Sequence, residues 1–136
     1  MNTNFPNWNH DTCHAFPGYK NFDVPFAVLE SAMRQSDWKA ELSIKGIFLI
    51  TDTKTGKMYV GKASGLEGLW QRWRDYICDG HGGDVDLKAL MDSNGGLEYA
   101  RENYKFTILE VIESNVEDDI DARESYWRRV LMSRME

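Results

Sequence analysis

Two short apolar segments joined by a turn constrain the fold more than any other feature of this sequence. Residues 46–51 read Gly-Ile-Phe-Leu-Ile-Thr, a strand-sized run that is apolar on both faces. Residues 52–56, Asp-Thr-Lys-Thr-Gly, supply turn chemistry, and residues 57–61, Lys-Met-Tyr-Val-Gly, return as a second strand. We therefore predict a β-hairpin, and we expect its first strand to be covered on both sides.

Helical periodicity follows the hairpin directly. Apolar side chains recur at positions i, i+3, i+4, i+7 and i+11, which is the stripe of an amphipathic helix. The residues of this stripe are Leu66, Leu69, Trp70, Trp73 and Ile77. The pattern predicts an amphipathic helix whose tryptophans belong to the core.

The rest of the chain adds two more helices and a third strand. A glycine-rich break at residues 79–83 precedes a helix at about 85–91, and residues 104–112 alternate as a strand. An acidic loop then leads to a last helix at about residues 119–132. This order predicts an α+β fold in which a small three-stranded, antiparallel-type sheet is flanked by helices.

The N-terminal third has a different character. Its first twenty or so residues lack periodicity, and a helix is expected to begin at Asp23 as N-cap, with Pro25 in its first turn. A second short helix is expected at residues 37–42. We predict that residues 1–43 form an arm and a helix that pack on a domain spanning residues 44–136.

Length and composition narrow the class of protein. With 136 residues, of which 42% are hydrophobic and 28% charged, the chain suits a single folded domain. No apolar run approaches a membrane span, and no secretion signal is visible. Cys13 and Cys78 have no paired spacing, so we expect reduced thiols and a cytoplasmic protein without a membrane partner.

Charge is distributed unevenly. The net charge is −6, a sign that does not favour nucleic-acid binding. However, residues 45–76 hold six basic and three acidic side chains, a balance of +3, which leaves −9 for the remainder. Residues 110–124 hold seven acids and one arginine. A chain divided in this way can present one basic face to a phosphate backbone.

Four positions carry side chains that suit a functional site, and each of them also has an ordinary structural interpretation. Tyr59 lies in a strand, where a core or edge aromatic is the ordinary interpretation. Arg72 and Tyr76 stand four residues apart on one helix face, although an arginine there can simply cover apolar surface with its stem. His81 lies among glycines, where the backbone can approach a ligand closely, or it is a solvated loop histidine.

Glu124 is the most informative of the candidate residues. It falls within the apolar stripe formed by Ile120, Trp127 and Leu131 on the last predicted helix. A carboxylate directed toward a core must be paired, ligate a metal or shift its pKa. An ion pair with a neighbouring arginine and a functional role are both open at this point.

Taken in order, these residues resemble the motifs of the GIY-YIG nuclease family. Residues 46–48 correspond to the opening motif and residues 59–61 to the second motif, with a hairpin of the usual length between them. The family's arginine falls on Arg72. Tyr76 and His81 match positions where members often keep active-site groups.

The last helix completes the resemblance. Residues 123–127, Arg-Glu-Ser-Tyr-Trp, resemble the family's metal-binding glutamate segment. The resemblance covers about two-thirds of the chain, from residue 44 to 134. It implies Mg²⁺-dependent (or Mn²⁺-dependent) hydrolysis of DNA phosphodiester bonds, with Glu124 as the metal ligand.

The resemblance also implies roles for the other residues. Arg72 would clamp the phosphate and stabilise the transition state, and Tyr76 would bond the phosphate or the attacking water. Tyr59 would orient or deprotonate that water, with Lys62 or His81 lowering its pKa or relaying the proton. The resemblance therefore implies a catalytic set of six residues, which are Tyr59, Lys62, Arg72, Tyr76, His81 and Glu124.

Two departures from the family pattern keep alternatives open. Phe48 stands where the family usually has a tyrosine, and the sequence ends at Glu136, before the position of a family asparagine. A catalytically silent, nuclease-derived DNA-binding or regulatory module is the alternative, and a protein-interaction domain is a third hypothesis. No specificity motif is recognisable, so DNA preference, a homo-oligomer and a separate specificity domain stay open.

Overall fold

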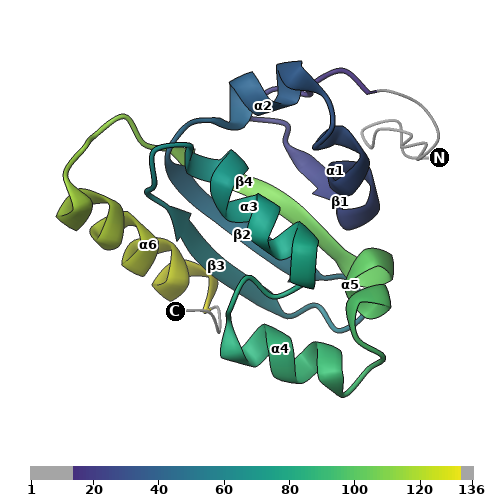
Figure 1. The fold of residues 1–136 in the computed structure, drawn as a ribbon. Coiled ribbons are helices and arrows are strands. Elements are labelled where there is room, and N and C mark those ends of the chain that lie inside the picture. Colours follow the sequence, from purple (N-terminus) through teal and green to yellow (C-terminus); the bar gives the residue numbers. More distant parts are fainter. Residues whose placement is uncertain (1–13, 133–136) are drawn as a thin grey trace, which may run out of the picture.

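The computed structural model describes residues 14–132, which form one sheet and six helices (Figure 1). The elements in chain order are β1 (Asp23–Pro25), α1 (Phe26–Ala32), α2 (Ser36–Leu42), β2 (Gly46–Asp52), β3 (Met58–Ala63), α3 (Gly68–Asp79), α4 (Val85–Asp92), α5 (Leu97–Asn103), β4 (Tyr104–Val111) and α6 (Glu117–Leu131). The predicted α+β class is confirmed, and α5 is a helix that the sequence pattern did not indicate.

The sheet has four antiparallel strands in the order β1-β4-β2-β3, where three were predicted. The additional strand is β1, because Val24 pairs with Phe106 and Asp23 with Thr107. The predicted helix start at Asp23 is therefore wrong, and Pro25 is the N-cap of α1 instead. Proline tolerates this position because an edge strand leaves its nitrogen without a ladder partner.

The hairpin forms as predicted, and its first strand, β2, lies between β4 and β3 in the sheet. β2 pairs with β3 from Gly46↔Ala63 to Thr51↔Met58, and with β4 on its other edge. A register shift between Ile47 and Phe48 marks an irregularity in the β2–β4 ladder. β3 is left as an edge strand, with one side open to the helices beside it.

Two apolar clusters cover the two faces of β2, which confirms the predicted cover on each side. The larger contains Phe48 and Ile50 and packs beneath α1, α2, α3, α4 and α5. The smaller contains Ile47 and Val60 and packs against α6 through Ile120. Alternate residues of one strand therefore bury against different helices. The edge strand β3 contacts both α3 and α6, and α6 lies beside it (Figure 1).

The tryptophan-bearing helix, α3, begins later than its stripe suggested. Leu69, Trp70 and Trp73 are buried as predicted, whereas Leu66 is 97% exposed in the preceding turn. Gly68 explains the start of the helix, because its φ is +52° and a Cβ there would lie 2.1 Å from the carbonyl oxygen of Ile44. Only glycine fits this junction, so α3 begins at Gly68 and Leu66 is left in the turn before it.

Residues 22–42 share the main core with the later elements. Phe22, Phe26 and Trp38 are among its buried side chains, and Phe22 packs on the Trp73 ring at a centroid distance of 5.2 Å. Cys78 is an exposed free thiol, and Cys13 lies outside the described residues. Within residues 14–132, none of the helices combines the length and apolar character that crossing a membrane requires.

Candidate active site

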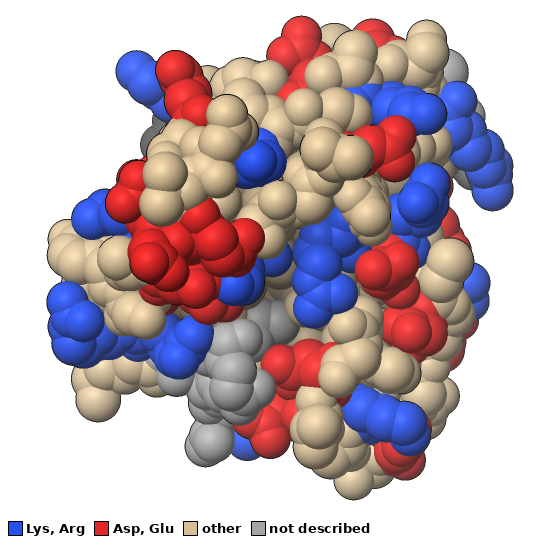
Figure 2. Space-filling view, turned by 60° about the vertical axis from the view of Figure 1, so that its left-hand side comes forward, with Lys and Arg blue, Asp and Glu red and all other residues tan. Residues whose placement is uncertain are grey.

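A hollow of about 410 Å³ opens at the edge of β3, between α3 and α6. It is called the site hollow here, and its lining includes Lys62, Gln71, Arg72, Tyr76, Asp84 and Glu124. Four of the six residues predicted from the sequence meet there: Lys62, Arg72, Tyr76 and Glu124. Figure 2 shows acidic and basic side chains gathered next to each other on this side of the molecule.

Arg72 is fixed and accessible at the same time. Its Nη1 donates a hydrogen bond to the carbonyl of Gly82 at 2.9 Å, and its Nη2 donates to the hydroxyl of Tyr76 at 3.2 Å. The guanidinium also lies 4.7 Å from the centre of the Tyr76 ring. Its side chain remains 34% exposed, so a rigidly held cation with further donors faces the solvent.

Tyr76 lines the hollow with a neutral phenol, while its ring is fully buried and belongs to the main core. Burial raises the pKa of its hydroxyl, an effect that the adjacent Arg72 opposes, and the group stays protonated at neutral pH. Because this hydroxyl accepts a hydrogen bond from Arg72, its own proton is left to donate. Phe48 packs edge-on against the Tyr76 ring at 5.8 Å and holds it from behind.

Glu124 confirms the prediction of a carboxylate inside an apolar stripe. It is 7% exposed and follows Ile120 by one turn of α6. Burial raises the pKa of its carboxyl, while the positive charges of Arg128, Lys62 and Arg72 act in the opposite direction. The ion-pair interpretation is confirmed, since Glu124 pairs with Arg128. Glu124 also lines the site hollow, and its functional role stays a prediction.

Lys62 is held by two acids of α6. Its Nζ donates to Glu117 at 2.8 Å and also to Asp121. These hydrogen bonds raise the pKa of the lysine well above its usual value, so the ammonium is not deprotonated near neutral pH. The geometry therefore suits a fixed positive charge and does not suit a proton relay at Lys62.

His81 shapes the loop beside the hollow and is not one of the described residues that line it. Its Nδ1 accepts a hydrogen bond from the Gly83 N–H at 2.9 Å, and Asp79 accepts from the His81 and Gly82 N–H groups. Gly82 must be glycine, since a Cβ at its φ of +56° would lie 2.8 Å from the Tyr76 ring. His81 thus helps place the carbonyl that holds Arg72.

Tyr59 lies in the main core, away from its predicted place in the hollow. Like Tyr76, it is buried in the cluster beneath the helices, but unlike Tyr76 it is absent from the described lining of the site hollow. Tyr99, close by, donates a 2.6 Å hydrogen bond to the fully buried Asp52. The ordinary interpretation of a strand tyrosine as a core aromatic fits this position.

The structure adds residues that the motifs did not indicate. Asp84 lines the hollow and caps α4 by accepting the Leu87 N–H at 2.9 Å. The sequence carried a signal for it, because an aspartate between a glycine pair and an apolar-periodic segment is a typical N-cap. Arg128 also carried a signal, since it stands four residues after Glu124 on the same helix.

The donor set at the hollow fits a cation held by one protein carboxylate. Among residues 14–132, no group of three or more His, Cys, Asp or Glu side chains is placed to hold a metal ion. Mg²⁺ keeps several waters and binds through one or two carboxylates plus phosphate oxygens. Glu124, a hard oxygen donor at the wall of a polar hollow, therefore fits such an ion, with water and substrate oxygens completing its coordination.

Comparisons with known proteins find similarity among solved structures. No family model matches the sequence, and no curated protein matches it. Among solved structures, the chain is similar to the catalytic domain of homing endonuclease I-TevI, with 28% identity, a TM-score of 0.49, and coverage of 66% of this chain and 90% of that chain. A glutamate-to-alanine mutant of the catalytic domain of intron endonuclease I-TevI matches with 27% identity, a TM-score of 0.46, and coverage of 65% and 84%. The catalytic domain of I-TevI is a GIY-YIG nuclease domain, so these structures represent the family that the sequence motifs resemble.

Proposed function

We propose that the chain is a metal-dependent DNA endonuclease that hydrolyses phosphodiester bonds at the site hollow. The observation that carries the proposal is the convergence of Glu124 from α6 with Arg72 and Tyr76 from α3 on one solvent-reachable hollow. A buried carboxylate, an anchored guanidinium and a neutral phenol are the groups that binding and polarising a phosphate diester requires.

Arg72 binds the phosphate in this proposal. Gly82 and Tyr76 hold its guanidinium, so little conformational freedom is lost when a non-bridging phosphate oxygen accepts its remaining donors. The same fixed charge stabilises the additional negative charge of the transition state. Tyr76 donates its proton to the phosphate or to the attacking water from the wall of the hollow.

Glu124 would hold a divalent cation, Mg²⁺ or Mn²⁺, at the wall of the hollow that it shares with Arg72. Such a cation, when bound, neutralises charge on a non-bridging oxygen and on the leaving oxygen. Lys62 keeps its positive charge beside Glu124 and contributes to the field that attracts the DNA backbone. No direct contact with the substrate is assigned to Tyr59 or His81, whose side chains serve the core and the loop.

The proposal is tested by nicking of supercoiled plasmid with Mg²⁺, Mn²⁺ or EDTA. We expect cation-dependent nicking, which Glu124→Gln and Arg72→Ala each reduce at least about 100-fold, the usual effect of removing one transition-state contact. Glu113→Gln is the matched control, because it removes an exposed carboxylate from the segment that precedes α6. Equal nicking by all four proteins would reject the assignment, and DNA binding without nicking would support the catalytically silent alternative.

A further inference from the structure

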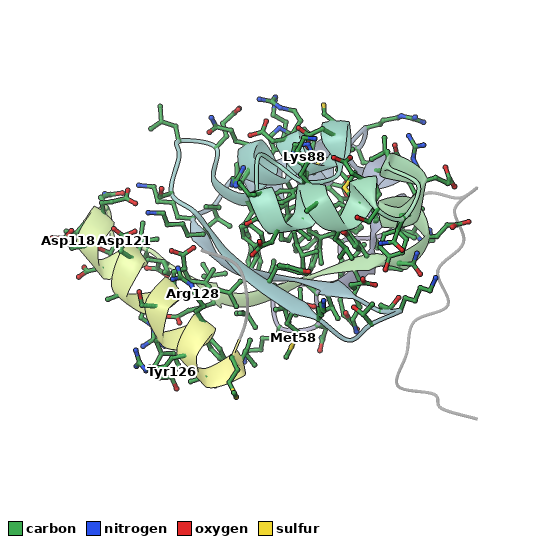
Figure 3. The ribbon with its side chains drawn as sticks, turned by 90° about the horizontal axis from the view of Figure 1, so that it is seen from below. Met58, Lys88, Asp118, Asp121, Tyr126 and Arg128 are labelled. Atoms are coloured by element: carbon green, nitrogen blue, oxygen red, sulfur yellow. The ribbon has the colours of Figure 1, made fainter. Side chains whose placement is uncertain are left out.

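The carboxylate proposed to hold the cation already has a positively charged partner on its own helix. Arg128 Nη2 lies 3.2 Å from Glu124 Oε1, an i,i+4 pair one turn apart on α6. The Glu124 side chain is 10% exposed and that of Arg128 is 33% exposed, so the pair is largely shielded from water. Figure 3 shows Arg128 on α6. One of the two carboxylate oxygens is therefore engaged by the guanidinium.

Arg128 is tied to Glu124 more than to its surroundings. Its Nε is buried and has no hydrogen-bond partner within residues 14–132. The neighbouring cation Arg123 and the indole of Trp127 instead bind Glu110 of β4. A guanidinium with a buried, unsatisfied donor lacks a complete hydrogen-bond network, so the ion pair with Glu124 holds it in place.

We infer that Arg128 is an internal counter-ion that competes with the divalent cation for Glu124, and thereby weakens cation binding at the site hollow. This inference rests on the proposed function, since it assumes that Glu124 holds the ion. The guanidinium occupies one carboxylate oxygen and repels a second positive charge. A unit charge at about 5 Å from a dication changes the affinity roughly tenfold even at the dielectric constant of water.

A role in which Arg128 merely positions Glu124 predicts the opposite effect. A carboxylate that loses its anchoring partner becomes less ordered, and cation binding weakens. A competing counter-ion, when its charge is removed, leaves both carboxylate oxygens to the cation, and binding tightens. The sign of the change in affinity therefore separates the two roles, without any measurement of cleavage.

The test is Mn²⁺ binding to the full chain without DNA, measured from the electron paramagnetic resonance signal of free Mn²⁺. We expect Arg128→Gln to tighten binding about tenfold, whereas Arg128→Lys stays within about twofold of the wild type because the charge is retained. Arg129→Gln is the matched control, since it removes the same charge from the next residue, whose guanidinium lies 5.9 Å from the centre of the Tyr126 ring. It should leave the affinity unchanged within about twofold.

Unchanged or weaker binding by Arg128→Gln overturns the inference, as does equal tightening by Arg129→Gln. Circular dichroism and thermal unfolding establish that each variant is folded. Glu124→Gln separates the two levels of the argument. If it abolishes Mn²⁺ binding while Arg128→Gln has no effect, the inference alone fails. If Glu124→Gln binds Mn²⁺ as the wild type does, the proposed cation site fails and the inference fails with it.

Discussion

Replacing Glu117 and Asp121 by their amides should strengthen DNA binding. These two carboxylates hold the ammonium of Lys62, the only lysine among the described residues that line the site hollow. A DNA phosphate that contacts Lys62 must first displace both of them. The double variant Glu117→Gln/Asp121→Asn removes this competition and leaves the positive charge at the hollow free to bind phosphate.

The size of the effect follows from the exposure of the groups involved. The three side chains of Lys62, Glu117 and Asp121 are all partly exposed, and exposed ion pairs are worth about 0.2–1 kcal/mol each. Removing both should strengthen DNA binding by about 1 kcal/mol, roughly fivefold. One additional lysine–phosphate contact also steepens the slope of log affinity against log salt by about 0.9.

Fluorescence anisotropy of a labelled duplex, titrated without divalent cations between low and moderate salt, measures both quantities. The control is Asp118→Asn/Asp119→Asn, which changes the net charge from −6 to −4 just as the test variant does, and whose two residues lie with Glu117 in the first turn of α6. Asp118 and Asp121 lie at the same end of that helix in Figure 3. Equal affinities and equal salt slopes for the two double variants would refute the competition for Lys62 and leave only a general effect of charge.

Two further predictions concern the buried tyrosines. Tyr99→Phe removes a hydrogen bond to the fully buried Asp52, so we expect a loss of about 2 kcal/mol in the free energy of unfolding and a fall in Tm of about 7 °C; a loss below about 0.5 kcal/mol in urea denaturation would contradict this. Burial raises the pKa of Tyr99 to about 12 and also raises the pKa values of Tyr76 and Tyr104, so the stability they contribute is complete below pH 10 and is lost as the pH rises through the folded-state values. Absorbance at 295 nm should therefore show phenols that ionise near pH 10 only in urea, and identical native and unfolded titrations would argue against their burial.

The sequence predicts the hairpin and α6 well because each has a strong local pattern. An apolar run with turn chemistry after it leaves few alternatives to β2 and β3, and a stripe of apolar side chains defines the buried face of α6. The burial of Glu124 follows from the same stripe. Local periodicity therefore suffices wherever an element's own side chains determine which face it buries.

Pattern alone does not predict β1, because three residues carry no periodicity. Val24 joins the sheet through pairing with Phe106, more than eighty residues away in the sequence. The pattern places Leu66 in the buried stripe, whereas the structure leaves it exposed, for a related reason. The start of α3 is set by the close approach of Gly68 to Ile44 and not by apolar spacing. Both features depend on contacts between distant segments, which a window of neighbouring residues does not contain.

The residues of the candidate site also differ in whether local spacing or contacts between distant segments determine their positions. Arg72 and Tyr76 share a helix face by spacing alone, so their meeting was predictable. Tyr59 was assigned to the hollow through the family resemblance, whereas its exposure of 2% depends on how the helices pack over β3. The role of His81 depends on a loop hydrogen bond between its ring and Gly83, which no sequence motif specifies.

The charges at the hollow connect the acidic composition of the chain with the proposed need for a cation. Its described lining includes two basic side chains, Lys62 and Arg72, and three acidic ones, Asp75, Asp84 and Glu124, a formal balance of 2 − 3 = −1. A phosphate diester that enters such a hollow meets no excess of positive charge from the protein. One bound dication would change the formal balance to +1, so the proposed cation would supply the attraction that the side chains lack. The acidic surface and the nuclease proposal are therefore compatible only if the divalent ion contributes to holding the phosphate as well as to cleaving it.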